Sequence, residues 1–242
     1  GLPAVGDILE QDGMLYLVMD YIEGHSLKEL LEKEKCFSQE QVAGWGLQLC
    51  RVLDYLHTRT PSVIYRDLKP SNVMQREDGT LALVDFGTAR EQKREAGGDT
   101  VWLGTRGYAA PEQWGGCGQT DARTDIYCLG TVLYQLVTGQ DPRKEPYGLY
   151  PIRRFRPELS AGLEEILEKC TRKDPKERFQ SCQELIYALE HYEEMDTRWR
   201  RKQKRRLEIF FCTVLAAFLC FCIGIYGWNM EKRLIKDTYQ AW

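Results

Sequence analysis

The strongest constraint on folding is a run of twenty residues, 209–228, that contains no charged side chain. A bilayer core about 30 Å thick needs about 20 residues of α-helix to cross it, so this run is long enough to span a membrane. The alternative is a buried core helix. Seven Lys and Arg residues in the preceding segment, 198–208, favour the span, because basic residues collect at its cytoplasmic end. We therefore expect one transmembrane helix over 209–228.

The predicted span divides the chain into parts with different surroundings. Residues 1–195 precede it as a globular body, 196–208 form a basic juxtamembrane segment, and 229–242 form an extracytoplasmic tail. The basic segment places the body in the cytoplasm, by the positive-inside rule. We expect a single-pass protein of the cell membrane in which residues 198–228 contact lipids.

The charge distribution argues against nucleic-acid binding. The whole chain has a formal net charge of -3, and its basic residues are concentrated in 198–208, so the body is acidic. Nucleic-acid binding depends on a basic surface. The basic segment itself adjoins the predicted span, where anionic lipid headgroups explain it better. We expect no nucleic-acid partner.

The nine cysteines stand singly along the body or within the uncharged run, without a Cys-x-x-Cys pair. No histidine lies near them at a spacing that suits zinc. This pattern indicates reduced thiols in a cytosolic domain. The three histidines, His25, His57 and His191, are far apart in the sequence, and we expect them to be structural or exposed to solvent.

Apolar periodicity predicts a body that mixes strands and helices. Two apolar runs, 5–10 and 15–19, flank an Asp-Gly pair, which predicts a β-hairpin. Ser38 and Gln41, three residues apart, predict the start of a helix that runs to about His57. Further helices are expected over 26–32, 125–136, 161–171 and 182–190, with short strands over 62–65 and 81–84.

Short motifs follow one another along the body in a fixed order. The longest is Tyr65-Arg66-Asp67-Leu68-Lys69-Pro70-Ser71-Asn72. Asp85-Phe86-Gly87, Ala110-Pro111-Glu112, Asp125 and Arg178 come after it. Each taken alone is an ordinary loop sequence, but the ordered set is not. The chain resembles eukaryotic-type serine/threonine protein kinases, and most closely the bacterial membrane-anchored ones.

The resemblance implies an α+β, protein-kinase-like fold. The body would hold mainly the helical C-lobe, residues 23–195, and a remnant β-hairpin of the N-lobe with the hinge, residues 1–22. It also implies ATP and Mg²⁺ as cofactors and proteins as substrates, with phosphate transferred to Ser or Thr hydroxyls in signalling.

By the same resemblance, four residues would carry the chemistry. Phosphoryl transfer needs positioning and charge neutralisation more than covalent help. Asp67 would orient the attacking hydroxyl and accept its proton, and Lys69 would reach the transferred phosphate. Asn72 and Asp85 would offer hard oxygen ligands to Mg²⁺.

Three further residues would bind the adenine of ATP by the same resemblance. Asp20 and Ile22 would supply hinge backbone groups, and Met74 would form the floor of the pocket. Asp85 would contact the nucleotide through the metal ion.

Other motif residues would be architectural. Phe86 and Gly87 complete the Asp-Phe-Gly motif, and Phe86 would pack against Tyr65. Asp125 resembles the helix-borne aspartate that holds the catalytic loop's backbone. An ion pair between Glu112 and Arg178 would secure the end of the activation segment.

The resemblance also implies regulation through the activation segment, which would be residues 87–108. Arg66 would pair with a phosphorylated residue there, and Thr100 is the hydroxyl best placed to carry the phosphate. Thr105 resembles the threonine that contacts the catalytic aspartate and lysine, so its modification would block the substrate groove.

The sequence departs from the family in one respect. A working kinase also needs a glycine-rich loop and a strand lysine, yet the first lysine here is Lys28 and the first arginine is Arg51. We expect the sequence to be a piece of a longer protein whose upstream part supplies them. The alternative is an inactive, pseudokinase-like membrane scaffold, and the upstream reading frame would decide between them.

Overall fold

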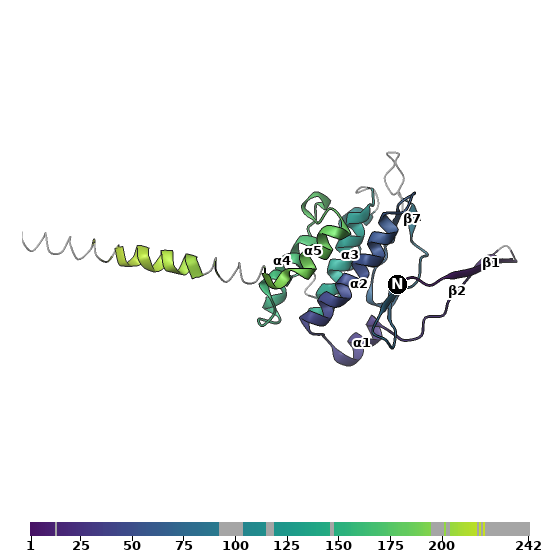
Figure 1. The fold of residues 1–242 in the computed structure, drawn as a ribbon, viewed down its shortest axis with the longest axis horizontal. Coiled ribbons are helices and arrows are strands. Elements are labelled where there is room, and N and C mark those ends of the chain that lie inside the picture. Colours follow the sequence, from purple (N-terminus) through teal and green to yellow (C-terminus); the bar gives the residue numbers. More distant parts are fainter. Residues whose placement is uncertain are drawn as a thin grey trace, which may run out of the picture. The chain divides into compact units, whose positions relative to one another are not determined.

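The computed structural model divides the chain into two compact units, residues 1–195 and 196–242, and each is described by itself. All elements labelled in Figure 1 belong to the first unit. The structure describes residues 1–12, 14–91, 104–114, 119–145, 148–194, 201, 204–216, 218 and 220.

The first unit begins with the predicted β-hairpin. β1 (Val5–Gln11) pairs antiparallel with β2 (Met14–Met19). Ile8 and Tyr16 point to opposite faces of this two-stranded sheet, yet they are 64% and 48% exposed. Figure 1 shows the hairpin projecting from the helices. Its strands are therefore held mainly by the hydrogen bonds between them.

Among the described residues of the first unit there are five α-helices, and each begins after a residue whose side-chain oxygen accepts a backbone N–H bond. Such N-caps contribute about 1 kcal/mol each. The helices are α1 (Leu27–Glu34), α2 (Gln39–His57), α3 (Ala122–Thr138), α4 (Ala161–Cys170) and α5 (Cys182–Glu190), capped by Ser26, Ser38, Asp121, Ser160 and Ser181. The predicted helices are confirmed, with α3 longer at both ends than expected.

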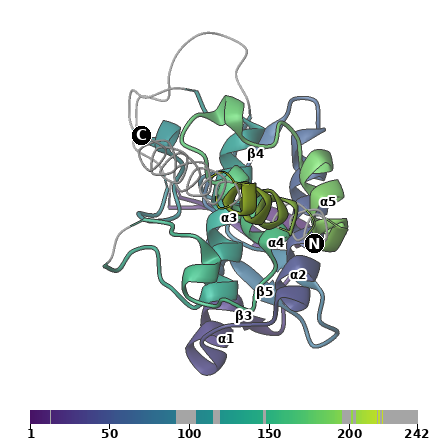
Figure 2. The ribbon, with the colours of Figure 1, turned by 90° about the vertical axis from the view of Figure 1, so that its left-hand side faces the viewer.

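The core lies among these helices. α2 packs against α3 and α5, and α3 packs against α4 (Figures 1 and 2). Gly46 of α2 lies where an added Cβ would sit 3.0 Å from both Leu133 and Leu189, so a glycine lets the three helices approach closely. Leu49 and Leu185 are fully buried beside it. Burial of each such leucine stabilises the fold by about 1.5–3 kcal/mol.

Short strands and 3₁₀ helices organise the loops between the helices. β3 (His25–Ser26), β5 (Val73–Gln75) and β6 (Leu81–Leu83) form an antiparallel sheet, and β4 (Val63–Ile64) pairs with β7 (Arg90–Glu91). β4 and β6 lie within the predicted strands 62–65 and 81–84, whereas β3, β5 and β7 were not predicted. Strands of this length are too short for alternation to reveal them. The 3₁₀ helices are η1 (Pro70–Asn72), η2 (Pro111–Gln113), η3 (Ile152–Arg154) and η4 (Pro175–Glu177).

In the second unit, residues 204–216 are helical. Over the residues that the structure describes, no helix is both long enough and apolar enough to cross a membrane. The predicted span, 209–228, lies partly outside the described residues, and the predicted tail, 229–242, lies entirely outside them. The α+β fold is confirmed for the first unit, and the transmembrane helix stays a prediction.

Candidate active site

A buried carboxylate holds the loop that follows β4. Asp125 of α3 accepts hydrogen bonds from the backbone N–H of Tyr65 at 2.9 Å and from that of Arg66 at 2.7 Å. Its side chain is 0% exposed. Arg66 has a φ of 68°, a left-handed backbone that costs a non-glycine residue about 1–3 kcal/mol. The two hydrogen bonds that Asp125 accepts help to keep the loop in this strained conformation.

His57, the last residue of α2, contacts the same carboxylate from the other side. Its Nε2 lies 2.7 Å from Asp125 Oδ2, and its Nδ1 lies 3.6 Å from Cys182 Sγ at the start of α5. The imidazole is 8% exposed. His57 is thus a structural residue that joins three helices beneath the loop. No sequence signal marks this role, because its partners lie 68 and 125 residues away.

Asp67, Lys69 and Thr105 meet in one hydrogen-bonded cluster. Lys69 Nζ donates to Asp67 Oδ2 at 2.6 Å and to Thr105 Oγ1 at 3.1 Å. The Thr105 hydroxyl donates to Asp67 Oδ1 at 2.8 Å. A hydroxyl therefore fits between this carboxylate and this ammonium group. Asp67 is able to accept a proton from a hydroxyl in that position, and Lys69 is able to neutralise an anion beside it.

Asn72 and Asp85 provide the oxygen atoms expected to bind a metal ion. Asn72 Nδ2 donates to the backbone oxygen of Asp67 at 3.1 Å, which holds the amide in the loop. Asp85 follows β6 with a φ of 66°, is exposed, and accepts a bond from the N–H of Gly87 at 3.1 Å. An amide and a carboxylate oxygen suit Mg²⁺, which keeps several waters and takes phosphate oxygens as further ligands.

Mg²⁺ is usually bound by one or two protein side chains together with waters and substrate phosphates. Among the described residues, no three His, Cys, Asp or Glu side chains gather where they could hold a metal ion.

Phe86 packs against the loop from the other end. Its ring lies 5.2 Å from that of Tyr65 at an interplanar angle of 77°, an edge-to-face contact. The Tyr65 hydroxyl donates to the backbone oxygen of Val84 at 2.5 Å, and burial raises the pKa of Tyr65. Tyr65 therefore ties the start of the loop to the segment that carries Asp85.

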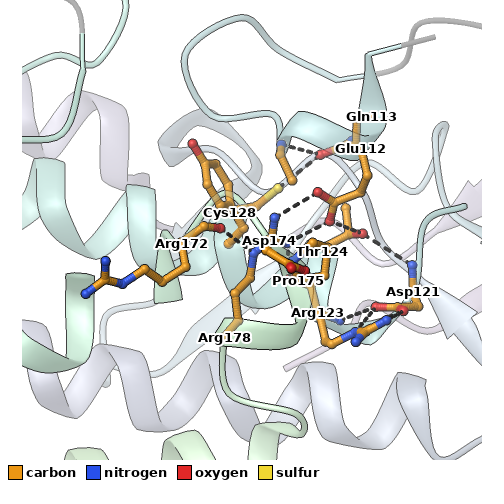
Figure 3. Close-up of polar contacts among 12 residues, drawn as sticks. Glu112, Gln113, Asp121, Arg123, Thr124, Cys128, Arg172, Asp174, Pro175 and Arg178 are labelled. Carbon is orange, nitrogen blue, oxygen red and sulfur yellow. Dashed lines mark hydrogen bonds and ion pairs between the residues drawn. The ribbon is translucent and has the colours of Figure 1, made fainter. Parts of the chain in front are cut away.

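A buried ion pair joins the segment after Thr105 to the last helical region. Arg178 donates to both carboxylate oxygens of Glu112, at 2.6 Å and 2.8 Å, and Thr124 of α3 donates to the same carboxylate at 2.9 Å (Figure 3). Arg178 also donates to the backbone oxygens of Arg172 and Arg123. The predicted pair is present, and its side chains are 0% and 7% exposed.

Gln113, beside Glu112, is a further structural residue that the sequence motifs do not reveal. It is 1% exposed, and its Nε2 donates to the backbone oxygen of Arg66 at 2.7 Å, while its Oε1 accepts from the N–H of Ala110 at 2.8 Å. It therefore connects the catalytic loop to η2. Its partner Arg66 lies 47 residues earlier, so no local pattern could have revealed the contact.

The residues expected to bind adenine lie in two segments, the connection between β2 and β3 and the strand β5. Asp20 follows β2, and its N–H donates to the backbone oxygen of Ala4 at 2.9 Å. Ile22 is half-buried between β2 and β3, and Met74 is half-buried in β5, paired with Ser26 and Ala82. The role of the three residues stays a prediction.

The regulatory residues are described in part. The Arg66 guanidinium donates from Nε and Nη2 to the backbone oxygen of Thr88, at 2.8 Å and 2.6 Å. It thereby contacts the start of the activation segment. Thr100 lies outside the described residues, so its pairing with Arg66 stays a prediction.

Comparison with known proteins agrees with this geometry. The family model for the protein kinase domain matches residues 4–189. A probable serine/threonine-protein kinase of Clostridium perfringens is 31% identical over 76% of this chain and 28% of its own length. One of Streptomyces coelicolor is 32% identical over 76% of this chain and 29% of its own length. Bovine serine/threonine-protein kinase Sgk1 is 30% identical over 73% of this chain and 42% of its own length. The chain thus spans less than half the length of these curated relatives.

Proposed function

The chain belongs to the protein kinase family, and from that premise we propose that it transfers the γ-phosphate of ATP to serine or threonine hydroxyls of proteins. The observation that carries this proposal is the cluster of Asp67, Lys69 and Thr105, in which a hydroxyl lies 2.8 Å from the carboxylate and 3.1 Å from the ammonium group. A substrate hydroxyl in the same position would have its base and its cation already in place.

Each residue of the site would have a distinct role in the transfer. Asp67 orients the attacking hydroxyl and takes its proton, and Lys69 stabilises the charge on the transferred phosphate. Asn72 and Asp85 would hold Mg²⁺, which when bound would neutralise charge on the nucleotide phosphates. Asp125, 0% exposed, keeps the loop that carries Asp67 in position.

The second candidate is an inactive, pseudokinase-like membrane scaffold. The family's strand lysine is part of the phosphate clamp, so an upstream reading frame that lacks such a lysine would favour this candidate. We favour the enzyme, with the glycine-rich loop and strand lysine supplied by an upstream segment of a longer protein. The four residues Asp67, Lys69, Asn72 and Asp85 serve phosphoryl transfer, and a scaffold would have no use for them together.

The enzyme and the scaffold are separated by a transfer assay. The chain, and the chain extended by its upstream coding sequence, are incubated with γ-labelled ATP, Mg²⁺ and a library of Ser- and Thr-containing peptides. The extended chain should label them, and Asp67→Asn should lower the rate at least about a hundredfold while ATP still binds. An upstream segment without a strand lysine, together with no labelling above that of Asp67→Asn, would establish the scaffold.

We also propose that the protein is anchored in the cell membrane, with the kinase body in the cytoplasm and a role in signalling. Support comes from the uncharged run 209–228 and from the seven basic residues in 198–208, which suit contact with anionic lipids. Protease added to intact cells should spare residues 1–195. Digestion of that body with the tail left intact would show the opposite orientation.

A further inference from the structure

The cluster around Lys69 adjoins a pocket of about 360 Å³, and most of the residues that line this pocket have no part in the proposed chemistry. Its walls come from α1, from the loop after α1 and from the loop after α3, and Lys69 and Thr105 also line it. Five of its lining residues are Lys or Arg and two are acidic, so the pocket carries positive charge. The body as a whole is acidic, so this charge is a local feature.

Most of the cations in the pocket already have carboxylate partners. These pairs are Lys69 with Asp67 at 2.6 Å, Lys28 with Glu32 at 3.8 Å, and Arg143 with Asp141 at 2.7 Å. Lys35 and Lys144 are different. Within the part of the chain that the structure describes, no ion pair is formed by either of them. Their charges are available to something that enters the pocket.

The wall that carries Lys35 is fixed in place. Lys35 ends α1 with a φ of 64°, and its N–H donates to the backbone oxygen of Leu31. The N–H of Phe37, two residues later, donates to the backbone oxygen of Leu136 in α3 at 2.9 Å. Gly139 ends α3 with a φ of 72°, and a Cβ there would lie 2.7 Å from the Lys35 oxygen. The turn at Lys35 is therefore held against the end of α3.

The opposite wall is also ordered by its own bonds. The N–H of Lys144 donates to the backbone oxygen of Asp141 at 3.0 Å. Asp141 accepts two side-chain bonds from Arg143, which lower the pKa of Asp141 and raise that of Arg143. The Asp141 carboxylate is thereby paired with Arg143. The two lysines thus stand on two preformed walls of one pocket, which limits the entropy lost when an anion binds between them.

We propose that this pocket binds an anionic side chain of the protein substrate, a carboxylate or a phosphate, beside the hydroxyl that is phosphorylated. The inference rests on the proposed function, because Asp67 and Lys69 set where the reacting hydroxyl lies. It adds a substrate class to that function: segments with an acidic residue close to the Ser or Thr. Lys35 and Lys144 are specificity residues in this proposal, and they take no part in the chemistry.

Binding of peptides to the full chain tests the proposal without requiring transfer. The acceptor is replaced by alanine, and a Glu-Glu pair is moved one position at a time along an otherwise neutral peptide. Fluorescence anisotropy then compares wild type with the K35E/K144E variant. Lys33→Glu is the matched control, because Lys33 is an exposed residue of α1 outside the pocket.

We expect one register of the Glu-Glu pair to bind about tenfold more tightly than the neutral peptide. Two surface ion pairs within their usual range give a factor of this size. The preference should vanish in K35E/K144E, persist in Lys33→Glu, and shrink as salt is raised. Circular dichroism checks that the variants fold, and K35Q/K144Q, without added acidic charge, should show the same loss. Equal binding of acidic and neutral peptides, or a preference that survives K35E/K144E, would overturn the proposal.

Two further arms separate related outcomes. A phosphoserine at the best register replaces the Glu-Glu pair, and tighter lysine-dependent binding of that peptide identifies phosphate as the anion recognised. In the transfer assay, equal labelling of acidic and neutral peptides would refute the specificity and leave the kinase intact. Lysine-dependent binding without any labelling would support the pocket and refute the proposed activity.

Discussion

The loop after β4 and the β1–β2 hairpin both lead into residues expected to contact ATP, but the fold holds them in opposite ways. Asp125 and Gln113 form hydrogen bonds with the loop directly, and His57 contacts Asp125. These three side chains are 0%, 1% and 8% exposed. The hairpin pairs with itself, and Ile8 and Tyr16 are exposed on its two faces.

The difference shows which contacts fix the geometry of this site. Contacts between residues that are distant in sequence fix the position of Asp67, so the loop can loosen only if the packing of α2 and α3 loosens with it. The hairpin can open locally, since little apolar surface packs against it. Asp67 is thus more firmly held than the hairpin that leads to Asp20 and Ile22, the residues expected to contact the nucleotide base.

The largest effect is expected from Arg178→Met. This change leaves Glu112 buried without its cation, which should cost about 3–5 kcal/mol in the free energy of unfolding. Arg51→Met removes a pair with Glu190 at 3.8 Å whose side chains are 65% and 44% exposed, and should cost less than about 1 kcal/mol. Urea denaturation of the two variants gives both numbers.

A second removal controls for the unpaired charge. Glu112→Gln combined with Arg178→Met should regain part of the stability, because no buried charge is left alone. Equal losses for Arg178→Met and Arg51→Met would contradict the importance given to the buried pair.

A smaller effect is expected from the same substitution made in the two regions. Tyr65→Phe removes the hydroxyl that donates to the Val84 oxygen at 2.5 Å, and should lower the free energy of unfolding by about 1–2 kcal/mol. Tyr16→Phe removes a hydroxyl from a half-exposed side chain of the hairpin, and should change it by less than about 0.5 kcal/mol. A cost for Tyr16→Phe as large as that for Tyr65→Phe would show that the hairpin is fastened elsewhere.

Much of the fold was predictable because it depends on local signals. Ser38 marks the start of α2, and the Asp-Gly pair marks the hairpin turn. The ordered motifs indicated the protein family. The resemblance to that family then predicted the contact of Asp125 with the loop and the pairing of Glu112 with Arg178. These contacts follow from residue identity within a known pattern.

The rest depends on partners that only the fold brings together. His57 was expected only to be structural or exposed, and nothing near it in the sequence points to Asp125 or Cys182. Gln113 and the turn at Lys35 are similar, since their partners Arg66 and Leu136 lie in other elements. The positive pocket could not be predicted for the same reason.

The most direct test of the comparison is amide hydrogen exchange of individual residues, measured by NMR in the wild type and in Asp125→Asn. In the wild type, the amides of Tyr65 and Arg66 should exchange only through global unfolding, whereas the ladder amides of β1 and β2 should exchange much faster. In Asp125→Asn, exchange at Tyr65 and Arg66 should accelerate while exchange in the hairpin stays the same. Hairpin amides as protected as those of Tyr65 and Arg66, or a loop unaffected by Asp125→Asn, would contradict the account.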